Sequence, residues 1–161
     1  MTDKQTSAAW RRRVSITLES TAAGERIVRS MEGDLFLKGR LLYIRYDEPP
    51  EAEMGRTVTT FKVEREELRI VRHGDVRFEQ SFIAGKRHIG YLHTQQGRME
   101  LETETVSLDV QYGDLPNSLD GIISVPEGSL TIGWSYKLSV MGEDAGEYRL
   151  SLRAVLLEDQ V

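Results

Sequence analysis

Cysteine is absent from the sequence, which excludes disulfides, thiolate metal sites and cysteine nucleophiles. No apolar run approaches the ~20 residues that a membrane-spanning helix needs. Residues 1–9 are polar and lack the apolar core of a signal peptide. We therefore expect a cytoplasmic protein that does not contact a membrane, with a disordered N-terminal tail over residues 1–9.

Neither sign of charge dominates the sequence, because 26 acidic and 21 basic residues are spread along the whole chain. The formal net charge of -5 leaves no extended basic surface, so we do not expect nucleic-acid binding. The one basic cluster is Arg11-Arg12-Arg13. We interpret it as the solvated start of a strand, and a contact with an anionic partner is the alternative.

Helical periodicity is missing from residues 68–110, which form strand-like runs joined by short turns. The turns at residues 73–75, 84–86 and 95–97 each contain a glycine. Glycine tolerates the positive φ that a tight hairpin requires. The region therefore predicts an up-and-down antiparallel meander.

Alternating apolar and polar residues extend over most of the remaining chain, giving about ten strands in hairpin order with little or no helix. The clearest strand covers residues 129–141, and residues 147–158 follow it with a matching inward set: Tyr148, Leu150, Leu152, Ala154 and Leu156. A chain of 161 residues suits one domain, placed here at residues 10–158. Closure removes exposed edges, so we predict a single antiparallel, mostly up-and-down β-barrel of about 8–10 strands.

Three local irregularities are expected. Gly33 lies inside the strand at residues 25–37, where a glycine marks a bend or bulge. Along residues 98–110 the apolar positions change from odd to even numbers, which predicts one extra residue near Thr105 and Val106. Residues 113–127 form an irregular connection that we expect to pack over one end of the barrel.

Four segments carry a resemblance to a known family: residues 71–82 (VRHGDVRFEQSF), 97–105 (GRMELETET), 43–46 (YIRY) and 130–136 (LTIGWSY). They resemble the YwiB-like family of uncharacterised bacterial proteins, over roughly residues 14–156. The resemblance implies a calycin-like (lipocalin-like) barrel. The family carries no established activity, so the resemblance leaves the function open.

Polar residues on otherwise apolar faces are the candidate ligand-binding residues. Arg72 shares its face with Leu68 and Ile70, and a buried guanidinium needs an anionic partner. We predict that Arg72 receives a ligand carboxylate or phosphate inside the barrel, as calycin relatives often do. Further candidates on inward faces are Gln80, Tyr91, Thr103, Thr105, Trp134 and Tyr136.

The alternative for Arg72 is that it reaches solvent at the rim or pairs with an internal acid. Gln80 and the threonines then satisfy one another. Trp134 and Tyr136 are, in this interpretation, core residues of the inner face and do not form a stacking platform for a ligand.

Metal, cofactor and catalytic sites are not predicted. The histidines are His73, His88 and His93, and the last two point to opposite faces of one strand. The row at Glu100, Glu102 and Glu104 has the spacing of a glycosidase pair. We interpret this row as a solvated outer face, neutralised by residues such as Lys137, Arg149 or Arg153.

The leading functional hypothesis is a non-enzymatic protein that binds a small, partly apolar or anionic molecule in the barrel interior. The alternative is a structural or interaction protein without such a ligand. It would associate as a homodimer through apolar strips at residues 155–157 and 41–44. An enzyme is the third hypothesis, although no Ser/His/Asp grouping or phosphate-binding loop supports it.

Overall fold

The computed structural model describes residues 10–39, 41–112 and 129–157, and these residues are almost entirely β-strand. The predicted tail at residues 1–9 and the connection at 113–127 lie outside them. One short 3-10 turn, η2 (Pro50–Ala52), is the single helical piece of the described residues. The strands are β1 (Trp10–Ala22), β2 (Glu25–Lys38), β3 (Leu41–Asp47), β4 (Thr57–Val63), β5 (Leu68–Gly74), β6 (Phe78–Phe82), β7 (Arg87–Thr94), β8 (Gly97–Gln111), β9 (Ser129–Val140) and β10 (Glu143–Leu156).

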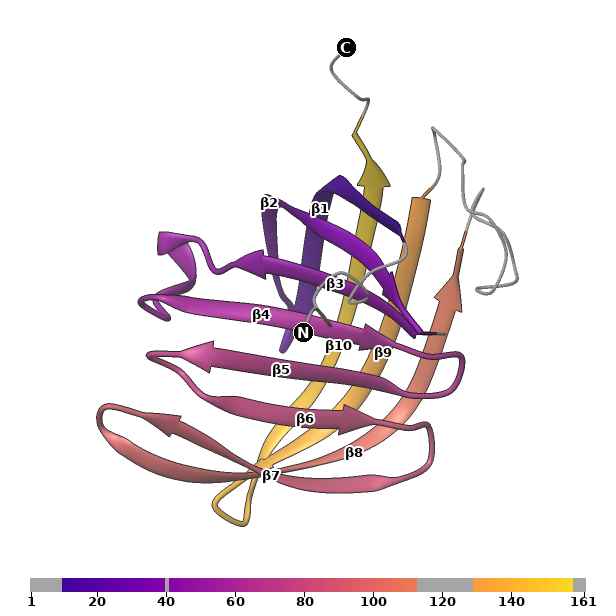
Figure 1. Ribbon diagram of the computed structural model, residues 1–161. Coiled ribbons are helices and arrows are strands. Elements are labelled where there is room, and N and C mark those ends of the chain that lie inside the picture. The colour runs from indigo at the N-terminus through magenta and orange to yellow at the C-terminus, as the bar shows by residue number, and fades with distance from the viewer. Residues whose placement is uncertain (1–9, 40, 113–128, 158–161) are drawn as a thin grey trace.

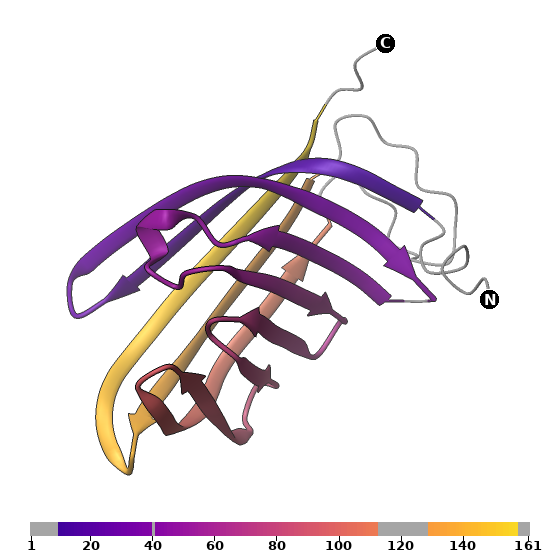
Figure 2. The same ribbon diagram turned by 60° about the vertical axis from the view of Figure 1, so that its left-hand side comes forward.

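All ten strands belong to one antiparallel sheet with the order β6-β5-β4-β3-β2-β1-β10-β9-β8-β7. Figures 1 and 2 show that β3 to β6 cross in front of the long strands β8, β9 and β10. β6 and β7, the first and last strands of this order, meet at a seam. There the backbone amides of Arg77 and His93 each donate to the other residue's carbonyl at 2.9 Å. The predicted antiparallel barrel is therefore confirmed and is nearly closed.

The barrel interior is lined by rows of residues that lie opposite one another across β2 to β6. The first row is apolar throughout: Leu37, Leu42, Val63, Leu68 and Phe82. The second row ends in one polar residue: Leu35, Ile44, Phe61, Ile70 and Gln80. The third row is mostly polar or amphipathic: Tyr46, Thr59, Arg72 and Phe78. The interior thus changes from an apolar end to a polar end.

The predicted bulge in β8 is confirmed. Thr105 lies opposite Tyr136 and Ser107 lies opposite Ser135, so Val106 is the extra residue. It points to solvent with 56% of its surface exposed. Gly33 does not produce a bulge, because the register between β1 and β2 runs through it without a shift. A side chain there would place its Cβ 2.5 Å from the carbonyl oxygen of Arg45, so glycine allows a close strand approach.

Candidate functional site

A buried ion pair occupies the polar end of the barrel interior. Nε of Arg72 lies 3.6 Å from Oε2 of Glu48, and the two side chains are 18% and 4% exposed. Thr59 lies opposite Arg72 and donates its hydroxyl hydrogen to the same Glu48 oxygen. These three residues are called the polar cluster below. They place Arg72 on the inner face and give it the internal acid that the sequence offered as one alternative.

Glu48 is the residue of this cluster that sequence reasoning missed. It lies in an acidic, proline-containing stretch after β3 that has no strand pattern, yet its backbone amide donates to the Thr57 carbonyl at 2.9 Å. This bond continues the pairing with β4 one residue past the end of β3, so the alternation of side chains continues to Glu48. Leu42, Ile44 and Tyr46 face inward, so the next even-numbered residue does too. That parity was the available signal.

Two phenols near the cluster are held in their neutral form. Burial raises the pKa of Tyr46 far above its usual range, the Glu48 carboxylate adds to the shift, and the Arg72 guanidinium opposes it. Burial raises the pKa of Tyr136 to about 12, with a contribution from Tyr148 and opposition from Arg72. Neither phenol therefore adds a charge to the polar cluster at neutral pH.

An open groove of about 400 Å³ follows the seam between β6 and β7 and reaches Arg72. Its lining comes from residues 71–73 of β5, residues 77–79 around the start of β6, and residues 88–91 and 93 of β7. We call it the seam groove. It brings together inner-face residues such as Arg72 with outer-face residues such as Tyr91, so it connects the polar end of the interior with the surface.

The three histidines all line the seam groove, which the sequence did not anticipate. His88 is half-buried and His93 is exposed, consistent with the predicted opposite faces. Burial lowers the pKa of His88, with Arg69 adding to the shift and the carboxylates of Glu79 and Glu67 opposing it. Residues 10–39, 41–112 and 129–157 contain no group of three His, Cys, Asp or Glu side chains arranged to hold a metal ion.

Four of the predicted site residues line the barrel interior as buried or packed groups. Nε2 of Gln80 donates to the hydroxyl of Thr103, which links β6 to β8 across the seam. Within the described part of the chain, the buried hydroxyl of Thr105 has no hydrogen-bond partner. Trp134 is a core residue whose ring lies 5.8 Å from Phe61 and 6.1 Å from Phe82.

Tyr136 completes this aromatic core beside the polar cluster. Its ring lies 5.0 Å from Phe82 and stacks on Tyr148 at 5.6 Å. Tyr136 therefore joins the aromatic residues packed against the core.

Tyr91 does not lie in the barrel interior, and its predicted inward position is wrong. It is 41% exposed on the outer face, where the guanidinium carbon of Arg98 lies 4.7 Å from its ring centre. The inner position next to it belongs to Gly90. A Cβ there would lie 2.8 Å from Oε1 of Gln80 and from the carbonyl of Glu79, so the seam requires glycine on the inside. Ile89 and Tyr91 of β7 face solvent as a result.

The predicted solvated acidic row of β8 lies on the outer face. Glu102 pairs with Arg87 at 3.6 Å, and Glu104 lies opposite Lys137. Arg87 is a partner that the sequence did not suggest.

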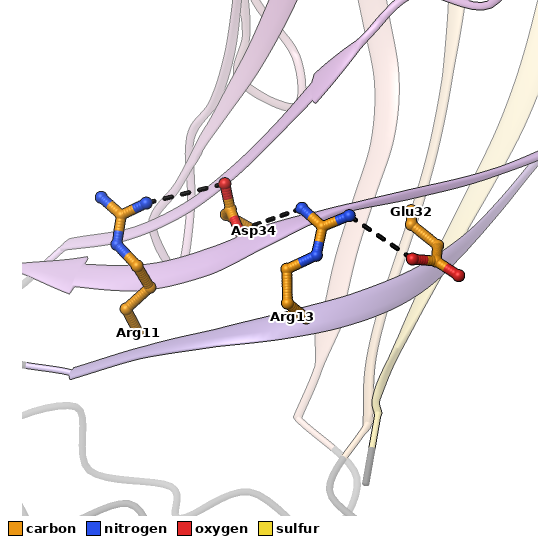
Figure 3. Close-up of polar contacts among 4 residues, drawn as sticks. All are labelled: Arg11, Arg13, Glu32 and Asp34. Atoms are coloured by element: carbon orange, nitrogen blue, oxygen red, sulfur yellow. Dashed lines mark hydrogen bonds and ion pairs between the residues drawn. The ribbon is translucent and has the colours of Figure 1, made fainter. Parts of the chain in front are cut away.

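Arg11 and Arg13 are likewise exposed and paired on the outer face. Figure 3 shows them alternating with Asp34 and Glu32 of β2, at nitrogen–oxygen distances of 3.2–3.6 Å. The arrangement supports the interpretation of the basic cluster as a solvated strand start.

The two apolar strips suggested for self-association are not exposed surfaces. Leu42, Ile44 and Leu156 point into the core. On the outer face of β3, Tyr43 stacks on Phe36 with ring centres 5.1 Å apart. The outward residues of the strips are half-buried: Leu41, Tyr43, Val155 and Leu157.

The comparisons with known proteins agree with this architecture. Residues 13–152 match a family model described as a domain of unknown function, DUF1934. The chain belongs to this family. It is 30% identical over 95 residues to the uncharacterized beta-barrel protein YwiB of Bacillus subtilis (strain 168), a match that spans 59% of this chain and 66% of the relative.

The crystal structure of the ywiB protein from Bacillus subtilis has a TM-score of 0.78 to this structure at 19% identity. The similarity covers 96% of this chain and 98% of that one, which shows a shared fold. The predicted membership of a YwiB-like family is therefore confirmed. The described residues contain no helix of the length and apolar character needed to cross a membrane.

Proposed function

We propose that the protein binds a small anionic molecule in the seam groove, with the acidic group of the ligand at Arg72. The observation that carries the proposal is the meeting of an open groove with a largely buried guanidinium. Buried charges are costly unless they are paired. A site that keeps a guanidinium group at the inner end of an open groove is suited to anion recognition.

The groups that line the groove offer hydrogen-bond donors to an anion. Two guanidinium groups, Arg72 and Arg77, line it together with one carboxylate, Glu79, and Glu48 is paired with Arg72. His73, His88 and His93 add imidazole N–H donors. A carboxylate or phosphate on the ligand can accept hydrogen bonds from this lining.

The geometry of the ion pair leaves part of Arg72 for a ligand. Glu48 meets the guanidinium at Nε. Arginine carries five N–H donors in a planar fork, so the terminal nitrogens are suited to a second anion. Glu48 then orients the fork, in the same way that a carboxylate orients other catalytic or binding cations.

The groove also provides apolar contacts for the rest of the ligand. The Phe78 ring centre lies 5.7 Å from the guanidinium carbon of Arg72, and the outer wall includes Ile89 and Tyr91. A volume of about 400 Å³ lies at the low end of the usual range for small-molecule sites. The ligand we propose is therefore compact and partly apolar, and it lies at the polar end because Trp134 and its neighbours fill the centre.

Native mass spectrometry followed by denaturation tests this proposal. The purified protein should carry a small bound mass that leaves on unfolding, or should bind members of a panel of small aromatic and aliphatic carboxylates and phosphates in calorimetry. Arg72→Met should weaken binding at least about tenfold, which corresponds to about 1.4 kcal/mol. Arg153→Met, which changes an exposed arginine of β10, is the matched control. Absence of anion binding to the wild-type chain, or equal binding by Arg72→Met, would overturn the proposal.

A further inference from the structure

One edge of the sheet has no partner strand in the described part of the chain. β2 pairs with β1 from Glu25 to Leu37, but it pairs with β3 only from Asp34 to Lys38. Residues 25–33 of β2 therefore have a hydrogen-bonded neighbour on one side. β3 leaves β2 at Gly33, and Figure 2 shows the β1–β2 hairpin reaching away from β3.

This edge lacks two of the features that commonly protect an exposed strand, proline and a β-bulge. Residues 25–33 contain no proline, and their register with β1 has no bulge. Ile27 and Val28 are each 49% exposed, on opposite faces of the strand. β6 and β7, the strands at the two ends of the sheet order, meet at the seam and so protect one another. Residues 25–33 of β2 have no such partner strand among the residues that the structure describes.

We propose that residues 25–29 of β2 pair antiparallel with the same residues of a second copy of this chain. The two-fold axis passes through Ile27, so that Ile27 lies opposite its counterpart and Glu25 lies opposite Arg29. This arrangement continues the sheet from one protomer into the other. It is isologous, because each residue of the patch meets its complement on an identical patch.

Charge complementarity selects this occupant and this register. Opposite residues of antiparallel strands share one face, so the pairing forms two Glu25–Arg29 ion pairs flanking an isoleucine contact. On the other face Val28 lies against the aliphatic stem of Arg26, whose charge is already neutralised by Glu19 within the hairpin.

Neighbouring two-fold registers lack these ion pairs. An axis at Val28 places Glu25 opposite Met31 and Arg29 opposite Ile27, and an axis at Arg29 places the two copies of that arginine opposite each other. Within the described residues, neither Glu25 nor Arg29 takes part in another ion pair, so both are available to a second copy.

Cysteine cross-linking tests the interface directly, because the chain has no cysteine of its own. Facing residues of antiparallel strands have Cα atoms about 4.5 to 5.5 Å apart, within the range that a disulfide spans. Ile27→Cys should therefore form an intermolecular disulfide under mild oxidation. Val106→Cys, at an equally exposed position on β8, is the control and should cross-link much less.

Sedimentation and charge reversal give the independent readout. The unmodified chain should sediment as a dimer at micromolar concentration, and Glu25→Arg should raise the dimer dissociation constant at least about tenfold. The double variant Glu25→Arg/Arg29→Glu exchanges the two charges and should restore the dimer. Circular dichroism of each variant checks that the barrel is folded.

Three results would overturn the inference. They are a monomer at all micromolar concentrations, a dimer that Glu25→Arg leaves unchanged, and equal cross-linking of Ile27→Cys and Val106→Cys. Binding of a foreign extended peptide along β2, with the chain itself monomeric, would also count against a second copy as the occupant. None of these results depends on whether the seam groove binds an anion.

Discussion

The two ends of the barrel interior use the same strand alternation but contain different residues. At one end the row from Leu37 to Phe82 is entirely apolar. At the other end Thr59 and Arg72 take the equivalent inward positions, with Glu48 beside them. The apolar end stabilises the fold by removing apolar surface from water. The polar end does not add comparable stability, because a buried ion pair gains little over well-packed apolar residues.

This difference indicates which end carries function. Replacing a buried ion pair with apolar side chains of similar volume is often neutral or stabilising. The polar cluster is thus not required for a barrel of this kind. Its position at the inner end of the seam groove is the reason we assign it to binding.

The largest loss of stability is expected from a change at the apolar end. Trp134→Ala removes a ring that packs against Phe61 and Phe82 and should lower the free energy of unfolding by about 3–5 kcal/mol. Urea unfolding followed by circular dichroism measures this change. Val106→Ala, at the exposed bulge, should stay within about 0.5 kcal/mol of the parent. A small loss for Trp134→Ala would contradict the assignment of the core to this end.

At the polar end we expect a smaller loss of stability, together with tighter anion binding. Glu48→Gln leaves Arg72 without its carboxylate and should lower the free energy of unfolding by about 2–3 kcal/mol, less than for a fully buried pair because Arg72 is partly exposed. The uncompensated guanidinium should then bind anions more tightly in calorimetry. Glu51→Gln, in the exposed 3-10 turn, should change neither quantity. Unchanged stability for Glu48→Gln would remove the proposed difference between the two ends.

The boundary between the two ends should respond to alkaline pH. The pKa of Tyr136 is about 12 in the folded protein and about 10 in the unfolded chain. Between these values the unfolded chain loses the phenolic proton and the folded protein keeps it. The free energy of unfolding therefore falls as pH rises, by about 2 kcal/mol at pH 12 from this residue.

The comparison of variants isolates that contribution. Tyr136→Phe should show a shallower alkaline loss in urea unfolding than the parent, while the exposed variant Tyr91→Phe should keep the full loss. Equal alkaline slopes for Tyr136→Phe and the parent would show that water reaches this phenol.

The smallest effect is expected on the outer face. Arg13→Ala removes two exposed ion pairs, to Asp34 and Glu32, and should change the free energy of unfolding by less than about 1 kcal/mol. Added salt should shrink the difference further, because exposed charges are screened. A loss comparable to that of Glu48→Gln would mean that the outer ladder contributes as much as the buried pair.

Much of the fold could be predicted because strand alternation is local. Odd and even residues point to opposite faces, so the inward set of β10 and the bulge at Val106 follow from the order of residues alone. The same rule would have placed Glu48 inside, had the strand been followed one residue past Asp47. The position of Tyr91 could not be predicted in this way, because the close approach of β6 requires Gly90 on the inner face and leaves the tyrosine outside.

The sequence by itself determined the strands, their antiparallel hairpin order and most of their inward faces, since a period of two is a property of the backbone. Only the tertiary structure decided that Glu48 meets Arg72, that three histidines line one groove, and that β2 keeps a free edge beyond Gly33. These features depend on how far each pair of strands stays in register and where the first and last strands meet. Register and closure are set by packing over the whole barrel, so no local pattern contains them.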